Sequence, residues 1–477
     1  MTTTTVSAPG KVLFAGGYLV LESPNIGYVV AADKRFYTEV KNDDNKQSSS
    51  GVNTVVVDSP QFHSSWTYEV QTKPDEEHVV SVVPSSENSS VNPFVEKTLR
   101  VMSAYILQTG NASSLGSLVV KIQADNDFYS VIPHLNGKAR TTENVDALPR
   151  FLKCPLDETT GKAVVNKTGL GSSAALTTSL VGALYEHFVT VPKEEAERKM
   201  EIHNLAQICH CYAQGKVGSG FDVSSAMNGS HLYKRFPKCV LPDLLQELAG
   251  GDGVKTSTGS LLDVVVKKTW SEDMAKPLPV PKGLQVLLAD VCGGSESPSM
   301  ARKVLAWKSS QQSEGSSAIP HWDDLKEINV KVAEIMQKLA SETIDTTSSS
   351  VLSKHPASEW KSLPKSSDND AATELLIELY DTFLKARGHL RAMGEAAGVP
   401  IEPPEQTKLC DETMKVPGVI TALVPGAGGY DAVACLYIDS AETKTAIGEL
   451  WANWNENKQM ICPLSVQATH QGISKEA

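Results

Sequence analysis

Residues 166–175 read NKTGLGSSAA, and the segment 173–188 that grows out of them is apolar enough to predict a helix. Two glycines and two serines therefore stand at a helix start. A surface turn needs one glycine, whereas a loop that lays its backbone N–H groups around an anion needs several small residues and the positive end of a helix. The stretch predicts a phosphate-binding loop. It is not a Walker A loop, because no lysine follows the second glycine. The alternative is a small-residue helix entry packed under a strand.

The segments around this loop predict a mixture of strands and helices. Residues 1–40 are rich in β-branched and aromatic residues, and further strands are predicted at 117–123, 261–268, 284–291, 419–424 and 432–438. Apolar stripes predict helices at 93–110, 193–214 and 371–397. Because strands and helices do not alternate regularly, an α+β fold is favoured over a doubly wound sheet.

The length of the chain predicts two domains. Its 477 residues exceed the roughly 100–200 that one domain usually takes. The pattern changes near residue 230, so we expect one domain over 1–230, with the phosphate-binding loop, and a second over 231–477. The serine-rich segment 341–370 predicts a flexible excursion from the second domain.

The charge of the chain excludes two classes of partner. A net charge of −12 argues against a nucleic-acid-binding or membrane-binding surface, because phosphate groups need a basic face. Any anionic ligand must then be held by a few lysines and arginines in a cleft. No run of about 18 apolar residues predicts a membrane span. The start, MTTTTVSAPGK, lacks the basic and apolar regions of a signal peptide, so we expect a cytoplasmic protein.

The eight cysteines are scattered, without a CxxC pair. The tract Cys209-His210-Cys211 has the composition of a metal site, but it lies in a predicted helix, where residues two apart point to different faces. Buried thiols are therefore the default interpretation, and metal binding is the alternative.

Three further motifs contain glycine close to a residue that can act in binding or catalysis. They are SAPGK (7–11) with FAGGY (14–18), GSGFD (218–222), and PGAGGYD (425–431). Lys11 can reach into a cleft from a strand, or it can be an ordinary solvated lysine. Asp222 can act in catalysis, or it can be a helix-capping aspartate. PGAGGYD can equally be a plain hairpin turn.

Taken together, SAPGKVLFAGGYLVLE, KTGLGSSAALTT, GKVGSGFDVSSA and PGAGGYDA resemble the signature motifs of the GHMP small-molecule kinases. The resemblance runs from about residue 6 to residue 438. It implies an N-terminal domain like ribosomal protein S5 domain 2, a ferredoxin-like C-terminal domain, and phosphoryl transfer from ATP to a small molecule. The segments NPFVEKTL, ADNDFYS and GGSESPSM are similar to those of a subgroup whose acceptor is itself a phosphate ester.

The resemblance also implies site residues. Lys11 matches the catalytic lysine of the family and Asp222 its catalytic aspartate. It implies ATP contacts by Lys167, Gly169, Leu170, Gly171, Ser172, Ser173 and Ala174. It implies substrate contacts by Tyr18, Lys167, Ser219, Arg235, Ser297, Ser299 and Ala427, with Arg302 as a spare cation.

The metal that the resemblance implies is Mg²⁺, with Ser173 as a ligand. Other members hold the metal with a helix glutamate, and the matching position here is His210, a poor ligand for an ion that prefers oxygen. The second protein ligand stays open. Three alternatives also stay open: a sister activity within the family, a catalytically inactive ligand sensor, and a structural protein with incidental glycine turns.

Overall fold

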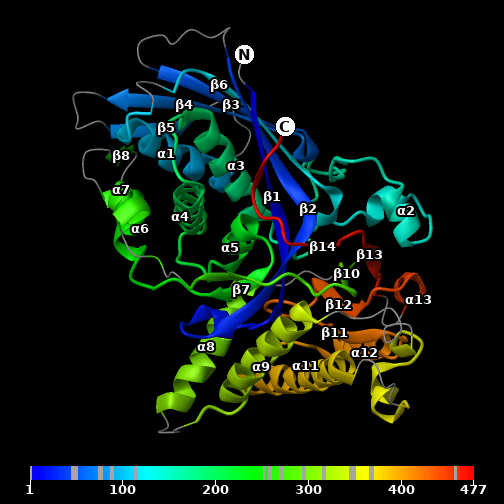
Figure 1. The fold of residues 1–477 in the computed structure, drawn as a ribbon. Coiled ribbons are helices and arrows are strands. Elements are labelled where there is room, and N and C mark those ends of the chain that lie inside the picture. Colours follow the sequence, from blue (N-terminus) through cyan, green and yellow to red (C-terminus); the bar gives the residue numbers. More distant parts are fainter. Residues whose placement is uncertain are drawn as a thin grey trace.

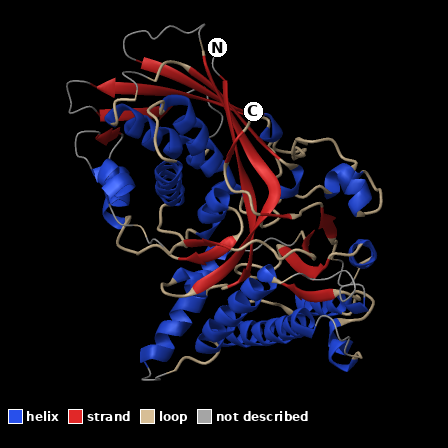
Figure 2. Ribbon diagram, viewed as in Figure 1, coloured by secondary structure: helices blue, strands red, loops and turns tan. Residues whose placement is uncertain are grey.

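The computed structural model describes residues 3–43, 52–73, 79–85, 91–111, 115–250, 253–255, 260–267, 270, 273–292, 297–313, 318–342, 351–364, 370–455 and 459–477. Within these ranges the strands form two sheets, and helices lie against both of them (Figures 1 and 2). The expected α+β fold is confirmed.

The first sheet contains eleven strands within the described ranges, and most of its neighbours are antiparallel. Its main path runs β15-β1-β2-β6-β3-β4-β5-β8, with β7 and β14 also paired to β2 and β9 paired to β7. The strands are β1 (Thr3–Ala15), β2 (Ile26–Asn42), β3 (Val52–Ser59), β4 (Ser64–Lys73), β5 (Val79–Pro84), β6 (Leu118–Ala124), β7 (His231–Lys234), β8 (Gly253–Lys255), β9 (Ala275–Pro277), β14 (Ala468–Thr469) and β15 (Ser474–Lys475).

Strand β1 is interrupted in its middle. The pairing with β2 shifts between Pro9, opposite Arg35, and Lys11, opposite Ala31. Such irregularities turn a side chain away from the regular alternation of a strand. Here the backbone N–H of Lys11 donates to the carbonyl oxygen of Leu170 at 2.9 Å, so β1 is joined to the glycine loop.

Helices cover one face of the first sheet (Figure 1). Helix α3 packs directly on β1 and β2, and its residues from Ala174 to Tyr185 are buried. This explains why 173–188 is apolar on all sides: the sheet lies on one side and other helices on the other. The helices of this part are α1 (Pro93–Gln108), α2 (Thr142–Asp146), α3 (Ser172–Phe188), α4 (Glu195–Gln214), α5 (Phe221–Asn228), α6 (Pro242–Ala249) and α7 (Ser260–Leu262).

The second sheet has the order β11-β12-β10-β13, and its recorded pairs are antiparallel. The hairpin predicted around PGAGGYD is confirmed, because β11 pairs with β12. The strands are β10 (Leu284–Asp290), β11 (Val419–Leu423), β12 (Ala432–Ile438) and β13 (Cys462–Leu464). The helices are α8 (Ser297–Ser313), α9 (Trp322–Ser341), α11 (Asp370–Ala397), α12 (Pro404–Met414) and α13 (Ala441–Ala452). None of the described helices is long and apolar enough to cross a bilayer.

The strand pairing departs from the predicted boundary at residue 230. Strands β7, β8 and β9 follow that residue and still belong to the first sheet. The last strands, β14 and β15, return to it as well, which brings the two ends of the chain together (Figure 1). The division into 1–230 and 231–477 stays a prediction. The sheets favour a boundary near residue 280, with the C-terminal tail assigned to the first unit.

One other prediction needs correction, and a second is only partly covered by the described residues. The strand predicted at 261–268 is wrong: α7 is followed there by a π-helical turn, Asp263–Lys267. The buried residues Leu261, Val264 and Val265 lie at helical spacing, which a short apolar run conceals. Within 341–370, residues 343–350 and 365–369 lie outside the described residues. The described part is packed, since Trp360 is 2% exposed and its indole N–H donates to the carbonyl oxygen of Leu352.

Two buried histidines predict sensitivity to acid. Burial lowers the pKa of His203 and of His231 to about 4. Both rings are therefore neutral in the folded protein, while the unfolded chain protonates them near pH 6.5. The stability that each contributes is complete above about pH 6.5 and falls as the pH drops towards 4, by roughly 3 kcal/mol each. Burial raises the pKa of Asp127 to about 6, so this carboxyl opposes the loss by roughly 3 kcal/mol over the same range.

Among these three groups the two histidines outweigh Asp127, so their combined contribution to stability falls in acid. We expect His231→Asn to reduce the difference in Tm between about pH 7 and about pH 4.5, because one proton fewer is taken up on unfolding. The amide of asparagine can still donate to the carbonyl oxygen of Gly229, as Nδ1 of His231 does at 2.8 Å. An exposed histidine, His355, provides the control variant His355→Asn. An unchanged pH dependence in His231→Asn would contradict this account.

Candidate active site

A cleft of about 800 Å³ lies where the first sheet, α3 and α5 meet β10, α8 and the PGAGGYD turn. Most of the predicted site residues line it. They are Lys11, Tyr18, Lys167, Gly169, Leu170, Gly171, Ser172, Ser173, Ser219, Asp222, Arg235 and Ala427. The motifs that are far apart in the sequence therefore converge on one cavity.

Three predicted residues whose side chains are described do not line this cleft, and a fourth is not described. Ala174 is 1% exposed inside α3, where it packs under the loop. Ser299 is half-buried on α8, and Arg302 is exposed on the same helix. Ser297 begins α8, but its side chain lies outside the described residues.

The glycine loop has the backbone of an anion-binding site. Gly169 and Gly171 both have positive φ angles, 82° and 78°, which favour glycine. Gly171 is the N-cap of α3, and no side chain caps the helix there. The first N–H groups of α3 therefore face the cleft with the positive end of the helix dipole. On the other side the loop is held by Thr168, whose backbone N–H and hydroxyl donate to the 127–128 backbone.

Lys11 extends across this loop. Its Nζ donates to the carbonyl oxygen of Gly169 at 2.9 Å and lies 5.4 Å from the centre of the Phe221 ring. A Cβ on Gly171 would lie 3.1 Å from Cε of Lys11, so the glycine leaves room for the lysine. Burial lowers the pKa of Lys11, and the nearby carboxylates of Asp222 and Asp431 act in the opposite direction. A desolvated ammonium is thus held beside the phosphate loop.

The ring of His210 lies between the glycine loop and Asp222. Its Nε2 lies 3.1 Å from Oγ of Ser173, 3.2 Å from the amide nitrogen of Gln214 and 3.9 Å from Oδ2 of Asp222. Burial lowers the pKa of His210, so the ring is neutral. Because the Gln214 amide nitrogen can only donate, Nε2 is an acceptor, and the ring carries its proton on Nδ1. The Ser173 hydroxyl then donates to Nε2 and keeps its lone pairs for the cleft.

The opposite wall is formed by the turns at 14–18 and 425–431. A Cβ on Gly17 would lie 2.6 Å from the carbonyl oxygen of Gly426, so this close approach requires glycine. The hydroxyl of Tyr18 donates to the carbonyl oxygen of Ala427. The two predicted substrate-side residues therefore support each other across the contact between the two halves of the cleft.

Arg235 lines the cleft, and its substrate contact stays a prediction. Its guanidinium donates to the carbonyl oxygens of Leu21, Val217 and Gly218. Burial lowers its pKa. These bonds tie the guanidinium to the GSGFD turn and to Leu21, and they leave its positive charge in the cleft. Ser219, on the same turn, accepts from the Tyr233 hydroxyl through its carbonyl oxygen.

Sequence reasoning missed several cleft residues. Lys216 lies in the motif GKVGSGFDVSSA, which also contains Asp222, and Asp431 is the last residue of PGAGGYD. Both motifs could therefore have pointed to these residues. Gln214 and Cys292 carried no signal. The tract around Cys209 and Cys211 follows the default interpretation: both thiols are buried, and burial raises the pKa of each.

Comparisons with known proteins agree with the geometry. The family described as the GHMP kinases N terminal domain matches residues 140–230. The chain is 33% identical to the phosphomevalonate kinase of Aspergillus fumigatus, over 96% of this chain and 91% of the relative. It is 34% identical to the peroxisomal phosphomevalonate kinase of Arabidopsis thaliana, over 99% and 95%. The fold is similar, with a TM-score of 0.57 and 15% identity over 98% and 100% of the two chains, to a Streptococcus pneumoniae phosphomevalonate kinase solved with phosphomevalonate and AMPPNP.

Proposed function

The chain belongs to the phosphomevalonate kinases of the GHMP kinase family, and on that basis we propose that it transfers the γ-phosphoryl group of ATP to (R)-5-phosphomevalonate. The products are ADP and 5-diphosphomevalonate, a step of isoprenoid and sterol synthesis. The observation that carries the proposal for this chain is the position of Lys11, whose Nζ donates to the glycine loop in the cleft that Asp222 also lines.

The chemistry of the acceptor decides what the residues must do. A phosphate monoester has a second pKa of about 6 and is mostly a dianion at neutral pH. Its oxygen is already nucleophilic, so a strong general base is not required. The main barrier is the repulsion between two anions, which positioning and cationic groups lower.

We assign the roles accordingly. The N–H groups at the start of α3, with Gly169, Leu170 and Gly171, hold the phosphates of ATP. Lys11 neutralises the charge that moves during transfer, and Asp222 orients Lys11 and the acceptor. We assign the acceptor side to Tyr18, Lys167, Ser219 and Ala427. All four line the cleft, and Lys216 and Lys238 are further cations there.

The donor set fits Mg²⁺ that enters with the nucleotide. Ser173 keeps hydroxyl lone pairs for the cleft, Asp222 offers a carboxylate oxygen, and Mg²⁺ prefers oxygen ligands. The neutral ring of His210 accepts from the Ser173 hydroxyl and so orients Ser173, and it is not itself a ligand. When bound, the ion would neutralise charge on the β- and γ-phosphates. A cytoplasmic location stays a prediction, since one relative is named as peroxisomal.

Purified protein tests the proposal in an ADP-release assay with ATP and Mg²⁺. We expect turnover with phosphomevalonate, little with mevalonate, and no carbon dioxide. Turnover with mevalonate, or release of carbon dioxide, would instead indicate a sister activity. Binding of phosphomevalonate without ADP release would indicate a ligand sensor, and either outcome would overturn the proposal.

A further inference from the structure

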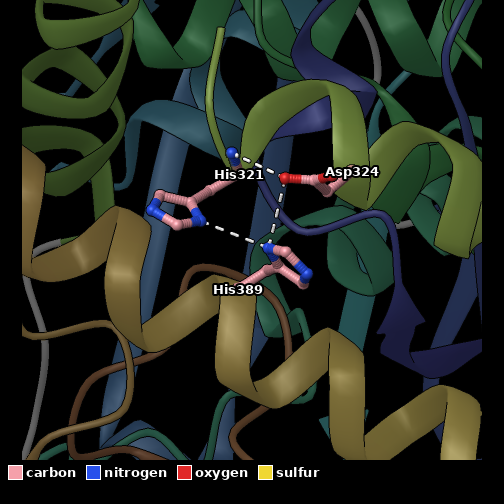
Figure 3. A group of neighbouring side chains, drawn as sticks. All are labelled: His321, Asp324 and His389. Atoms are coloured by element: carbon pink, nitrogen blue, oxygen red, sulfur yellow. Dashed lines mark hydrogen bonds and ion pairs between the residues drawn. The ribbon is translucent and has the colours of Figure 1, made fainter.

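A second group of potential ligands lies away from the cleft, at the surface where α9 begins. His321 precedes α9, Asp324 lies in its first turn, and His389 projects from α11. Figure 3 shows the two rings and the carboxylate turned toward one another. Within the described ranges, this is the group of three His, Cys, Asp or Glu side chains whose ligand atoms lie within 4.8 Å of one another.

The distances fit a tetrahedral ion. Nδ1 of His321 lies 3.2 Å from Nδ1 of His389, and that nitrogen lies 3.4 Å from Oδ2 of Asp324. Ligands at about 2.0–2.1 Å from zinc in a tetrahedron are separated by about 3.3–3.4 Å. Two of the ligand–ligand distances thus match the spacing that an ion at the centre would require, and all three ligand atoms lie within 4.8 Å of one another.

The contact between the two rings needs a proton on one Nδ1. The Nδ1 of His389 faces both the other ring and the carboxylate of Asp324, so one Nδ1–H there can serve both. A divalent cation can replace this shared proton and bond to all three atoms. Asp324 also accepts from the backbone N–H of His321 at 3.1 Å, which a carboxylate oxygen can do while it binds a metal.

The scaffold holds the ligands on rigid elements. His321 has a φ of 66°, unusual for a residue other than glycine, and forms a capping box with Asp324. Beneath the group, Trp322, Leu325 and Ala386 belong to one buried cluster that joins α9 to α11. Metal binding would exchange the capping bond of the His321 ring for coordination, while the bond from the His321 backbone to Asp324 remains.

We propose that His321, Asp324 and His389 bind one zinc-class divalent cation, which links α9 to α11. Two imidazoles and a carboxylate suit Zn²⁺, Co²⁺ or Ni²⁺ and not Mg²⁺. The side chain of Asp324 is 54% exposed and that of His389 is 31% exposed, so water can occupy the fourth position. The proposal is independent of the kinase activity.

Calorimetric titration of the full chain with ZnCl₂ tests it, together with titration with Co²⁺ followed by visible absorption. His321→Asn keeps a residue that tolerates a positive φ and caps helices, and His389→Gln changes a half-buried helix position. We expect each to lower the affinity of the site by more than the roughly 10–100-fold that loss of an outer-shell partner costs. We also expect Zn²⁺ to raise the Tm of the wild type and not that of the variants.

The matched control is His355→Gln, because His355 faces one carboxylate, Glu359, at 3.5 Å. It should bind Zn²⁺ like the wild type. Equal affinity in the wild type and in both site variants would assign the binding to other groups, such as the exposed thiols of Cys239 and Cys292, and would overturn the proposal. Absence of Zn²⁺ binding to the wild type would overturn it too.

Discussion

Lys11→Met is expected to lower kcat on the order of 10³-fold, the range seen when a charge-stabilising group is removed from a phosphoryl or acyl transfer site. The ammonium is desolvated, lies against the loop at Gly169 and has the carboxylates of Asp222 and Asp431 nearby. Methionine has a similar volume and no charge, so packing against Phe221 survives while the electrostatic contribution is lost.

The comparison with Asp222→Asn separates two mechanisms. If charge neutralisation dominates, this variant should lose much less kcat than Lys11→Met, because the acceptor needs no general base. Steady-state kinetics with ATP and phosphomevalonate measures both losses. Lys121→Met, an exposed lysine of β6 in the same sheet, is the control and should keep wild-type kcat. A far larger loss from Asp222→Asn would refute the dominant role of Lys11.

The second large effect concerns stability and lies outside the cleft. The guanidinium of Arg387, on α11, is paired with Glu402 through bonds of 3.0 and 2.6 Å, and Arg391 donates to the same carboxylate at 2.7 Å. The side chains of Arg387 and Glu402 are only 2% and 3% exposed. Arg387 also donates to Asp411 at 2.8 Å, so loss of Glu402 leaves its charge only partly compensated. Removing one partner of a buried pair typically costs about 3–5 kcal/mol.

Glu402→Gln, which keeps the size of the side chain, should therefore lower the Tm by roughly 3–5 °C for unfolding of the whole chain. Thermal unfolding followed by circular dichroism measures the shift. Glu412→Gln removes a partly exposed carboxylate from its surface pair with Lys415 and should change the Tm little. If both variants shift the Tm equally, the buried pair does not stabilise the fold as proposed.

This pair also affects the cleft. Glu402 follows Ile401, whose carbonyl oxygen accepts the backbone N–H of Gly429 at 2.9 Å. A Cβ on Gly428 would lie 2.1 Å from the same oxygen. The PGAGGYD turn, which carries Ala427 at the acceptor side, is thus supported by the segment that the buried pair holds. We expect the Glu402→Gln variant to have a raised KM for phosphomevalonate at temperatures where it remains folded.

The amino-acid sequence by itself determined the local features of this protein. Two glycines and two serines before an apolar run are enough to specify a loop with positive φ angles and an uncapped helix, because both depend on neighbouring residues. The order of the glycine motifs also identified the family correctly. The α+β fold followed from the mixture of strands and helices, whose periodicity is likewise local.

Only the tertiary structure decided which groups meet. Lys11 donates to a carbonyl 158 residues away, and the neutral state of His210 follows from its burial beside Ser173 and Asp222. The carbonyl oxygens that accept from Arg235 belong to two separate turns, so no sequence motif predicted these hydrogen bonds. The return of β14 and β15 to the first sheet was equally hidden. These features depend on long-range contacts and desolvation, which arise from packing and leave no periodic signal in the chain.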